Sequence, residues 1–218
     1  MTADDDRYVP AAGHSAFTRL YDPIMALSMR ESSWRTALVE RTNLDLPEGG
    51  VAADVGSGTG TFAIELAAAR HDSTVIGIDG DPESVAIAKS KPGSDRVRWD
   101  KGLATDLPLA DDSVNVASMS LLLHHLSPEA KSSALGEGER VLLPGGRLHV
   151  ADWGKPDAIT FAGFQLLRVL DGFVNTSEHA RGEIPKLIDA TGFEEVSVWR
   201  TLRTAWGSME FISAEKPR

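Results

Sequence analysis

The 218-residue sequence contains no cysteine. This absence excludes disulfide bonds, thiolate metal sites and cysteine nucleophiles. The sequence also lacks any run of the roughly 20 apolar residues that a membrane-spanning helix needs. The first six residues, Met1 to Asp6, are acidic rather than basic and no apolar segment follows them, so no secretory signal is expected. These features predict a cytoplasmic protein.

Positive charge is scarce. The chain has 22 lysines and arginines against 32 acidic residues, a formal net charge of −10, and its basic residues form no dense cluster. Such a chain is repelled by phosphate backbones and by anionic membrane surfaces. We therefore expect neither nucleic acid nor a membrane as partner, and a small molecule is the better candidate. The chain is expected to be a monomer or a homodimer.

Short apolar runs alternate with helical patterns after Pro47. Asp81 and Ser127 each precede a proline, which is typical of helix starts, and Pro144-Gly145-Gly146 is expected to stop a helix. Strands are predicted near 51–55, 74–79, 96–99, 114–119, 147–152, 195–200 and 208–214, and helices near 34–46, 62–70, 82–89, 128–143, 158–170 and 183–190. This alternation predicts an α/β fold, a three-layer sandwich with a mostly parallel seven-stranded sheet.

A glycine-rich turn lies between the first of these strands and its helix. It reads Asp54-Val55-Gly56-Ser57-Gly58-Thr59-Gly60. Glycines let a backbone turn tightly and approach a ligand closely, and amides at a helix start favour an anionic group. Asp79 ends the next strand, 79 − 56 = 23 residues after the first glycine, where a carboxylate can bind ribose hydroxyls. Together they predict a nucleoside cofactor, although dinucleotide sites use the different spacing G-x-G-x-x-G.

The stretch from Ala53 to Gly60 resembles motif I of the class I S-adenosylmethionine-dependent methyltransferases. Four further segments resemble, in order, the ubiquinone/menaquinone-type branch of that family (methyltransferase type 11-like): 77–79, 107–116, 123–126 and 143–148. The resemblance covers roughly residues 51–152 and implies a Rossmann-like methyltransferase fold. It also implies a single domain at 1–218, with a helical N-terminal extension (1–50), a cofactor-binding core (51–152), and substrate-side helices with the final two strands (153–218).

The resemblance implies a set of cofactor-binding residues. The loop residues Gly56, Ser57, Gly58 and Gly60 would hold the methionine part of S-adenosylmethionine, while Asp54 would orient the loop or bind the ammonium group through water. Asp79 would hold the ribose. The branch usually has Gly-Asp-Ala where this chain has Gly102-Leu103-Ala104, so Leu103 would pack against the adenine ring and leave backbone amides or Asp106 to bind its edge. The full expected set is Tyr21, Asp54, Gly56, Ser57, Gly58, Gly60, Asp79, Gly80, Gly102, Leu103, Ala104 and Ser120.

Candidate catalytic residues follow the fourth and fifth strands, where open α/β sheets place their ligands. They are His124, His125 and Asp152. A neutral histidine is a plausible general base at pH 7. Alternatively, one histidine packs or caps while the other is solvated, and Asp152 accepts backbone amides. No metal is expected, because no histidine and carboxylate spacing suggests a metal site.

Aromatic residues after the fifth strand include Trp153, Phe161, Phe164 and Phe173. They would suit an apolar or aromatic acceptor, or they are core residues at helical spacing. Arg168 and Arg181 are interpreted either as partners of a substrate carboxylate or as solvated surface residues.

Three functions fit these observations. The first is methyl transfer from S-adenosylmethionine to a small-molecule acceptor by in-line displacement, with S-adenosylhomocysteine as product. The second is a non-catalytic protein that binds either nucleoside. The third is a nicotinamide-dependent reductase on the same fold class, because fold does not fix function.

Overall fold

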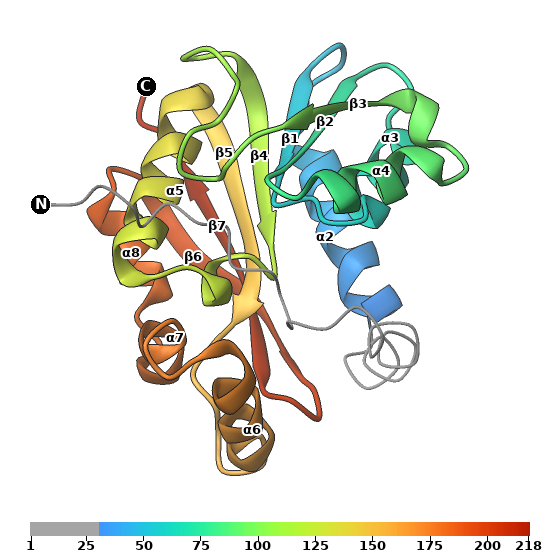
Figure 1. The fold of residues 1–218 in the computed structure, drawn as a ribbon. Coiled ribbons are helices and arrows are strands. Elements are labelled where there is room, and N and C mark those ends of the chain that lie inside the picture. Colours follow the sequence, from blue (N-terminus) through green and yellow to red (C-terminus); the bar gives the residue numbers. More distant parts are fainter. Residues whose placement is uncertain (1–30) are drawn as a thin grey trace, which may run out of the picture.

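Seven strands form one sheet in the order β3-β2-β1-β4-β5-β7-β6 (Figure 1). The structure is a computed structural model that describes residues 31–218. Strand β7 pairs antiparallel with β5 and β6, and the other pairings are parallel. The strands are β1 (Val51–Val55), β2 (Thr74–Asp79), β3 (Val97–Lys101), β4 (Val114–Ser120), β5 (Leu142–Trp153), β6 (Glu194–Arg203) and β7 (Ser208–Glu215). The predicted α/β sandwich is confirmed.

Helices cover both faces of the sheet (Figure 1). On one face α2 and α3 bury apolar side chains against the sheet, and on the other face α5 and α8 do so. The helices are α2 (Glu31–Asp45), α3 (Thr61–Ala69), α4 (Pro82–Ser90), α5 (Pro128–Val141), α6 (Phe161–Asp171), α7 (Ser177–Arg181) and α8 (Ile184–Ala190), with 3-10 turns η1 (Ser94–Arg96) and η2 (Leu123–His125). None of the helices within residues 31–218 has the length and apolarity to cross a bilayer.

The strand order reverses between β1 and β4. The chain runs outward from β1 through β2 to β3 and then returns to β4 on the other side of β1. Parallel register places Asp54 opposite Ser118 and Ser120 opposite Ala151. The last residues of β1, β4 and β5 therefore lie along one edge of the sheet at the point of reversal, where α/β proteins bind ligands.

Two helix starts form as predicted. The Asp81 carboxylate accepts hydrogen bonds from the amides of Glu83 (3.0 Å) and Ser84 (3.3 Å). The Ser127 hydroxyl accepts one from the Ala130 amide (3.2 Å). In each case a proline occupies the first helical position, where its missing N–H costs nothing.

The predicted stop at Pro144 is wrong. Helix α5 ends at Val141, and the turn at 144–146 belongs to the first part of β5. Leu142 already pairs with Val114 of β4, and the register then shifts before Arg147 pairs with Val116. Gly145 has a φ of +78°, and its amide donates to the Lys216 carbonyl at 2.9 Å. Strand pairing therefore ends this helix before its local breaker is reached.

Candidate active site

The glycine turn after β1 has a backbone that favours glycine. Gly56, Gly58 and Gly60 have φ values of +70°, +51° and +79°, in the left-handed region. A Cβ at Gly56 would lie 2.7 Å from the Leu122 Cδ1 atom, and one at Gly60 would overlap the Trp99 ring. A Cβ at Gly58 would meet no atom within 4 Å among the residues described. Side chains of Leu122 and Trp99 therefore pack against the first and third glycines of the turn, and no described residue fills the space beside the middle glycine, Gly58.

Asp79 holds this turn in place. One of its carboxylate oxygens accepts a hydrogen bond from the Gly58 amide at 2.7 Å, and the other accepts one from the Asp81 amide at 2.8 Å. The amides of Gly56 and Ser57 donate to the Ile78 carbonyl, both at 2.9 Å. Because each carboxylate oxygen has two lone pairs, Asp79 keeps acceptor capacity for hydroxyl donors.

Asp54 is buried with no hydrogen-bond partner for its carboxylate among residues 31–218. Its side chain lies at the end of β1 with 1% of its surface exposed, and neither carboxylate oxygen has a hydrogen bond within residues 31–218. Burial and the nearby Asp79 charge raise its pKa to about 8. The Ser57 hydroxyl beside the turn also has no partner in the described part of the chain. Because a buried carboxylate without a partner is costly, these oxygens fit a ligand that brings a cation and donors.

The turn after β3 lies beside the end of β2. The Gly102 amide donates to the Asp79 carbonyl at 3.1 Å, and Leu103 forms an isolated bridge with Asp106. Leu103 exposes 40% of its surface, so its apolar side chain is free to cover a flat ring. Gly80 and Ser120 are half-buried at the same edge. Tyr21 lies outside the described residues.

The structure brings His124 and Asp152 together, from η2 and β5. His124 Nδ1 lies 2.7 Å from Asp152 Oδ1, and both side chains are buried. Asp152 also accepts hydrogen bonds from the amides of Leu123 (2.8 Å) and Trp153 (2.7 Å). Leu121, where the chain leaves β4, has a strained φ of +50°. Asp152 therefore both accepts backbone amides and orients an imidazole.

Electrostatics in this pair are strong. Burial alone favours neutral His124, but the Asp152 carboxylate outweighs it and raises the pKa of this imidazole. Burial works against the Asp152 charge too, yet His124 and His179 hold the pKa of the carboxyl well below its usual range. With Nδ1 directed at Asp152, His124 presents Nε2 to the rest of the site.

His125 lies over His124. The ring centroids are 4.0 Å apart at a tilt of 41°, and 37% of the His125 side chain is exposed. The charge of His124 and burial lower the pKa of His125 to about 3. His125 is thus a neutral imidazole at the mouth of the site.

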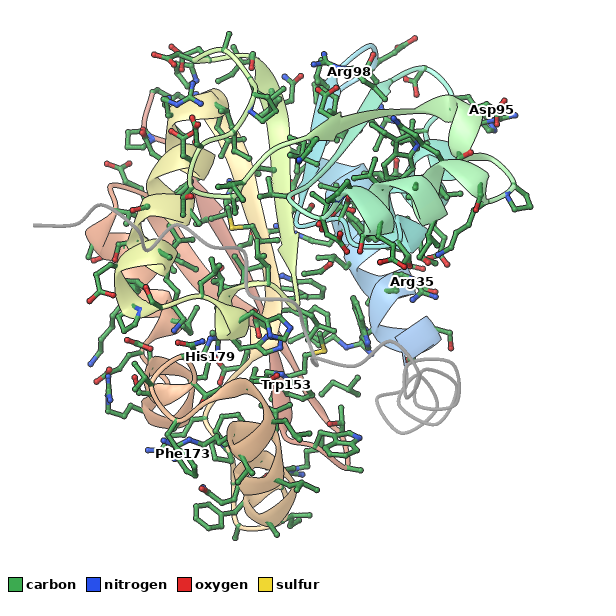
Figure 2. The ribbon with its side chains drawn as sticks, in the orientation of Figure 1. Arg35, Asp95, Arg98, Trp153, Phe173 and His179 are labelled. Carbon is green, nitrogen blue, oxygen red and sulfur yellow. The ribbon has the colours of Figure 1, made fainter. Side chains whose placement is uncertain are left out.

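Helices α6 and α7 close the site beyond the sheet edge. Asp171, the last residue of α6, places its carboxylate 3.9 Å from His124 Nε2 and 3.6 Å from His125 Nδ1. His179 of α7 donates through Nδ1 to the carbonyl of Trp153, the last residue of β5, at 2.6 Å, and Figure 2 labels both residues in the lower half of the molecule. Neither Asp171 nor His179 belongs to a recognised motif. One sequence signal could have indicated Asp171. It is an acidic residue at the C-terminal end of a predicted helix, where a negative charge is unfavourable without a partner.

The aromatic and arginine candidates divide between core and surface. Trp153 and Phe164 are buried together, whereas Phe161 and Phe173 are exposed. Arg168 lies over the Phe173 ring at 4.7 Å, and Arg181 pairs with Glu183 at 2.6 Å. Each arginine thus contacts a residue that is close to it in the sequence, Phe173 for Arg168 and Glu183 for Arg181.

Comparison with known proteins agrees with this arrangement. The methyltransferase-domain family matches residues 52–146. An uncharacterized methyltransferase of Synechocystis is 28% identical over 79% of this chain and 78% of its own length. A ubiquinone/menaquinone biosynthesis C-methyltransferase of Geotalea daltonii is 31% identical over 64% of this chain, which spans 61% of that relative.

Solved structures share the fold. The YcgJ protein of Bacillus subtilis has a TM-score of 0.70 at 17% identity, covering 84% of this chain and 98% of its own. A Thermotoga maritima methyltransferase, described as a possible histamine N-methyltransferase, has a TM-score of 0.63 at 25% identity, covering 92% and 96%. The five ordered motifs, the strand order and these relatives agree. The chain contains a methyltransferase domain over residues 52–146 and is similar to S-adenosylmethionine-dependent methyltransferases, several of them named for ubiquinone or menaquinone biosynthesis.

Proposed function

We propose that this chain transfers the methyl group of S-adenosylmethionine to a small-molecule acceptor by in-line displacement at the edge formed by β1, β4 and β5. The observation that carries the proposal is Asp54, a buried carboxylate with no partner in the described chain, directly before an open glycine turn. The methionine part of the cofactor supplies an ammonium group, the kind of cation that this carboxylate lacks.

The cofactor would lie across the ends of β1, β2 and β3. Gly56, Ser57, Gly58 and Gly60 would hold the methionine part, with Asp54 on the ammonium. Asp79 and Gly80 would bind the ribose through the acceptor capacity that Asp79 retains. The adenine would lie against Gly102, Leu103 and Ala104, with Ser120 and Tyr21 completing the set.

Methyl transfer breaks the bond between sulfur and the methyl carbon as the acceptor atom bonds to that carbon. The electron pair goes to sulfur, and S-adenosylhomocysteine leaves. Alignment of the two reactants can lower the barrier by about 7–11 kcal/mol. We propose that His124 Nε2 takes the acceptor proton, that Asp152 positions the ring through its 2.7 Å contact, and that His125 lines the approach.

A small acceptor is supported by the charge of the chain, whose net value of −10 opposes nucleic acid and anionic surfaces. The Geotalea relative is named as a C-methyltransferase of ubiquinone/menaquinone biosynthesis, a name that also points to a small-molecule acceptor. An apolar or aromatic acceptor also fits the aromatic residues after β5.

The direct test is incubation with methyl-labelled S-adenosylmethionine and a fractionated metabolite extract. Label should enter one small-molecule fraction, and His124→Asn should slow that transfer by about 10²–10⁴-fold while S-adenosylhomocysteine affinity holds. If label enters no product while the labelled cofactor stays bound, the protein is a non-catalytic binder. Affinity for NAD(P) without affinity for S-adenosylhomocysteine would favour the reductase.

Asp79→Ala tests the placement of the ribose. Loss of hydrogen bonds to a charged acceptor should weaken S-adenosylhomocysteine binding by about 1.5–3 kcal/mol in calorimetry. Asp95→Ala is the matched control, because Asp95 is exposed in η1 at the far end of the molecule (Figure 2). Equal dissociation constants for wild type and Asp79→Ala would remove Asp79 from the cofactor site.

A further inference from the structure

Three side chains beyond the carboxyl ends of β4 and β5, where the methyl acceptor is proposed to bind, converge without hydrogen bonds to one another. They are His124 and His125 of η2 and Asp171 at the end of α6, and one ligand atom from each lies within 4.8 Å of the other two. We propose that these three side chains bind one divalent transition-metal ion. The ion goes beyond the sequence analysis, which expected no metal.

The spacing of the atoms suits an ion better than direct pairing. The Asp171 carboxylate lies 3.9 Å from His124 Nε2 and 3.6 Å from His125 Nδ1. Both separations are too long for good hydrogen bonds. Two ligands held at about 2.0–2.1 Å from a tetrahedral ion lie roughly 3.3–3.4 Å apart. Both carboxylate distances exceed this spacing by a few tenths of an ångström, and the ligand atoms of the two histidines lie within 4.8 Å of each other, so modest side-chain movements would place all three around one ion.

The neighbourhood of His124 provides the outer shell that metal sites use. A ligating histidine usually donates its other ring N–H to a carboxylate, which fixes the ring and its tautomer. Asp152 accepts such a bond from His124 Nδ1 at 2.7 Å, and two backbone amides hold Asp152 in turn. His124 Nε2 thereby faces Asp171, and a bound ion would take the place of the proton on this nitrogen.

The field of α6 also favours a cation here. Asp171 is the last residue of this 11-residue helix, whose C-terminal end carries partial negative charge. Lys131, the nearest buried cation of α5, is already paired with Glu178 at 2.9 Å and contacts the Asn175 carbonyl. A bound ion would balance the Asp171 and Asp152 carboxylates, which have no other cation than histidine beside them in the described chain.

The donor set indicates which ion binds. Two imidazoles with one carboxylate suit Zn²⁺, Co²⁺ or Fe²⁺, whereas Mg²⁺ and Ca²⁺ prefer oxygen ligands. Three protein ligands leave at least one coordination position open for another molecule. The partial exposure of His125 gives that position access to solvent.

The open coordination position indicates that the methyl acceptor carries a hydroxyl group. This inference rests on the proposed function. An acceptor hydroxyl bound to the ion would release its proton to solvent, because a metal ion lowers the pKa of a bound oxygen. The oxygen would then attack the methyl carbon, forming a C–O bond while the S–C bond breaks and its electron pair stays on sulfur. With the ion bound, His124 is a ligand and the base role of Nε2 is not needed.

Cobalt titration of the full chain, stripped with a chelator, tests the site. Calorimetry and visible absorption should both report one saturable Co²⁺ per chain, unaffected by excess Mg²⁺. His125→Ala and Asp171→Asn should each weaken Co²⁺ binding at least roughly tenfold and alter the absorption bands. His71→Ala and Asp189→Asn, exposed residues away from the cluster, are the matched controls and should bind as wild type.

Absence of saturable binding to the wild type, or wild-type binding by both His125→Ala and Asp171→Asn, would overturn the metal site. Half-exposed His125 keeps the test usable if Asp171→Asn folds poorly. Affinity for S-adenosylhomocysteine, measured on the same samples, separates the two proposals. Nucleoside binding without Co²⁺ binding refutes only the metal site, and Co²⁺ binding without nucleoside binding supports the metal site while refuting the proposed function.

Discussion

At the scale of single residues, two buried aspartates have opposite environments. Asp152 accepts bonds from His124 and from backbone amides, and these donors favour its charged form. Asp54 has no such donor in residues 31–218, and burial favours its neutral form. The first carboxylate is built into the scaffold, and the second is available to a ligand.

The raised pKa of Asp54 predicts a pH-dependent stability of the ligand-free protein. Its pKa is about 8 in the folded chain against a model-peptide value of 3.8. The folded state therefore binds a proton that the unfolded state has released between about pH 4 and pH 8. Over that window the free energy of unfolding should fall by up to about 1.4 kcal/mol per pH unit as pH rises.

Denaturant unfolding of wild type and Asp54→Asn at several pH values checks this prediction. Asp54→Asn should lack this pH-dependent loss, so that its stability relative to wild type improves from pH 5 to pH 8. Asp95→Asn, an exposed control, should follow the wild type. Parallel curves for wild type and Asp54→Asn would mean that Asp54 is ionised in the folded chain at neutral pH.

At the scale of elements, the glycine turn joins β1 to α3 through positions with different constraints. Gly60 is enclosed by the Trp99 ring and Ala88, whereas no atom of residues 31–218 lies within 4 Å of a Cβ built at Gly58. Gly60→Ala should therefore destabilise the fold by more than the roughly 1–3 kcal/mol of a left-handed backbone alone. Gly58→Ala should cost only about that strain.

The two variants should rank in the opposite order when the loss of S-adenosylhomocysteine affinity is compared instead of the loss of stability. A methyl group at Gly58 would enter the space proposed for the methionine part, so folded Gly58→Ala should bind S-adenosylhomocysteine more weakly than folded Gly60→Ala. Thermal unfolding and calorimetry on both proteins provide the comparison. Equal losses of affinity would indicate that the open side of the turn does not face the cofactor.

Most elements were predictable because their signals are local. The buried runs of β1, β2 and β4 and the proline-capped starts of α4 and α5 follow from short stretches of sequence. The five-residue helix α7 was not predicted. It is tied to α5 by the Lys131 and Glu178 pair, a contact between residues far apart in the chain. The end of α5 was misplaced for the same kind of reason, since pairing with β4 outweighed Pro144.

The candidate site divides in a similar way. The glycine turn and Asp79 could be identified because contiguous motifs contain them. His124 and Asp152 followed from the rule that parallel strands present their carboxyl ends together. Asp171 could not be added, because only the packing of α6 beyond the sheet edge brings it to the histidines.

At the scale of the whole molecule, the two apolar cores lie on opposite faces of one sheet, whose strand order reverses between β1 and β4. The proposed cofactor lies on the β1 to β3 side of this point, and the His124 cluster lies on the β4 and β5 side. Figure 1 shows α6 and α7 extending beyond that same edge. The proposed acceptor residues and the proposed cofactor turn therefore come from separate parts of the chain.

The central claim is that Asp54 and the turn after β1 bind the amino-acid end of the cofactor. Calorimetry of wild type and Asp54→Asn with two ligands tests it most directly: S-adenosylhomocysteine, and 5′-methylthioadenosine, which lacks the ammonium and carboxylate groups. The account predicts that Asp54→Asn weakens S-adenosylhomocysteine by about 1.5–3 kcal/mol and leaves 5′-methylthioadenosine unchanged. Equal affinity of both proteins for S-adenosylhomocysteine would contradict it.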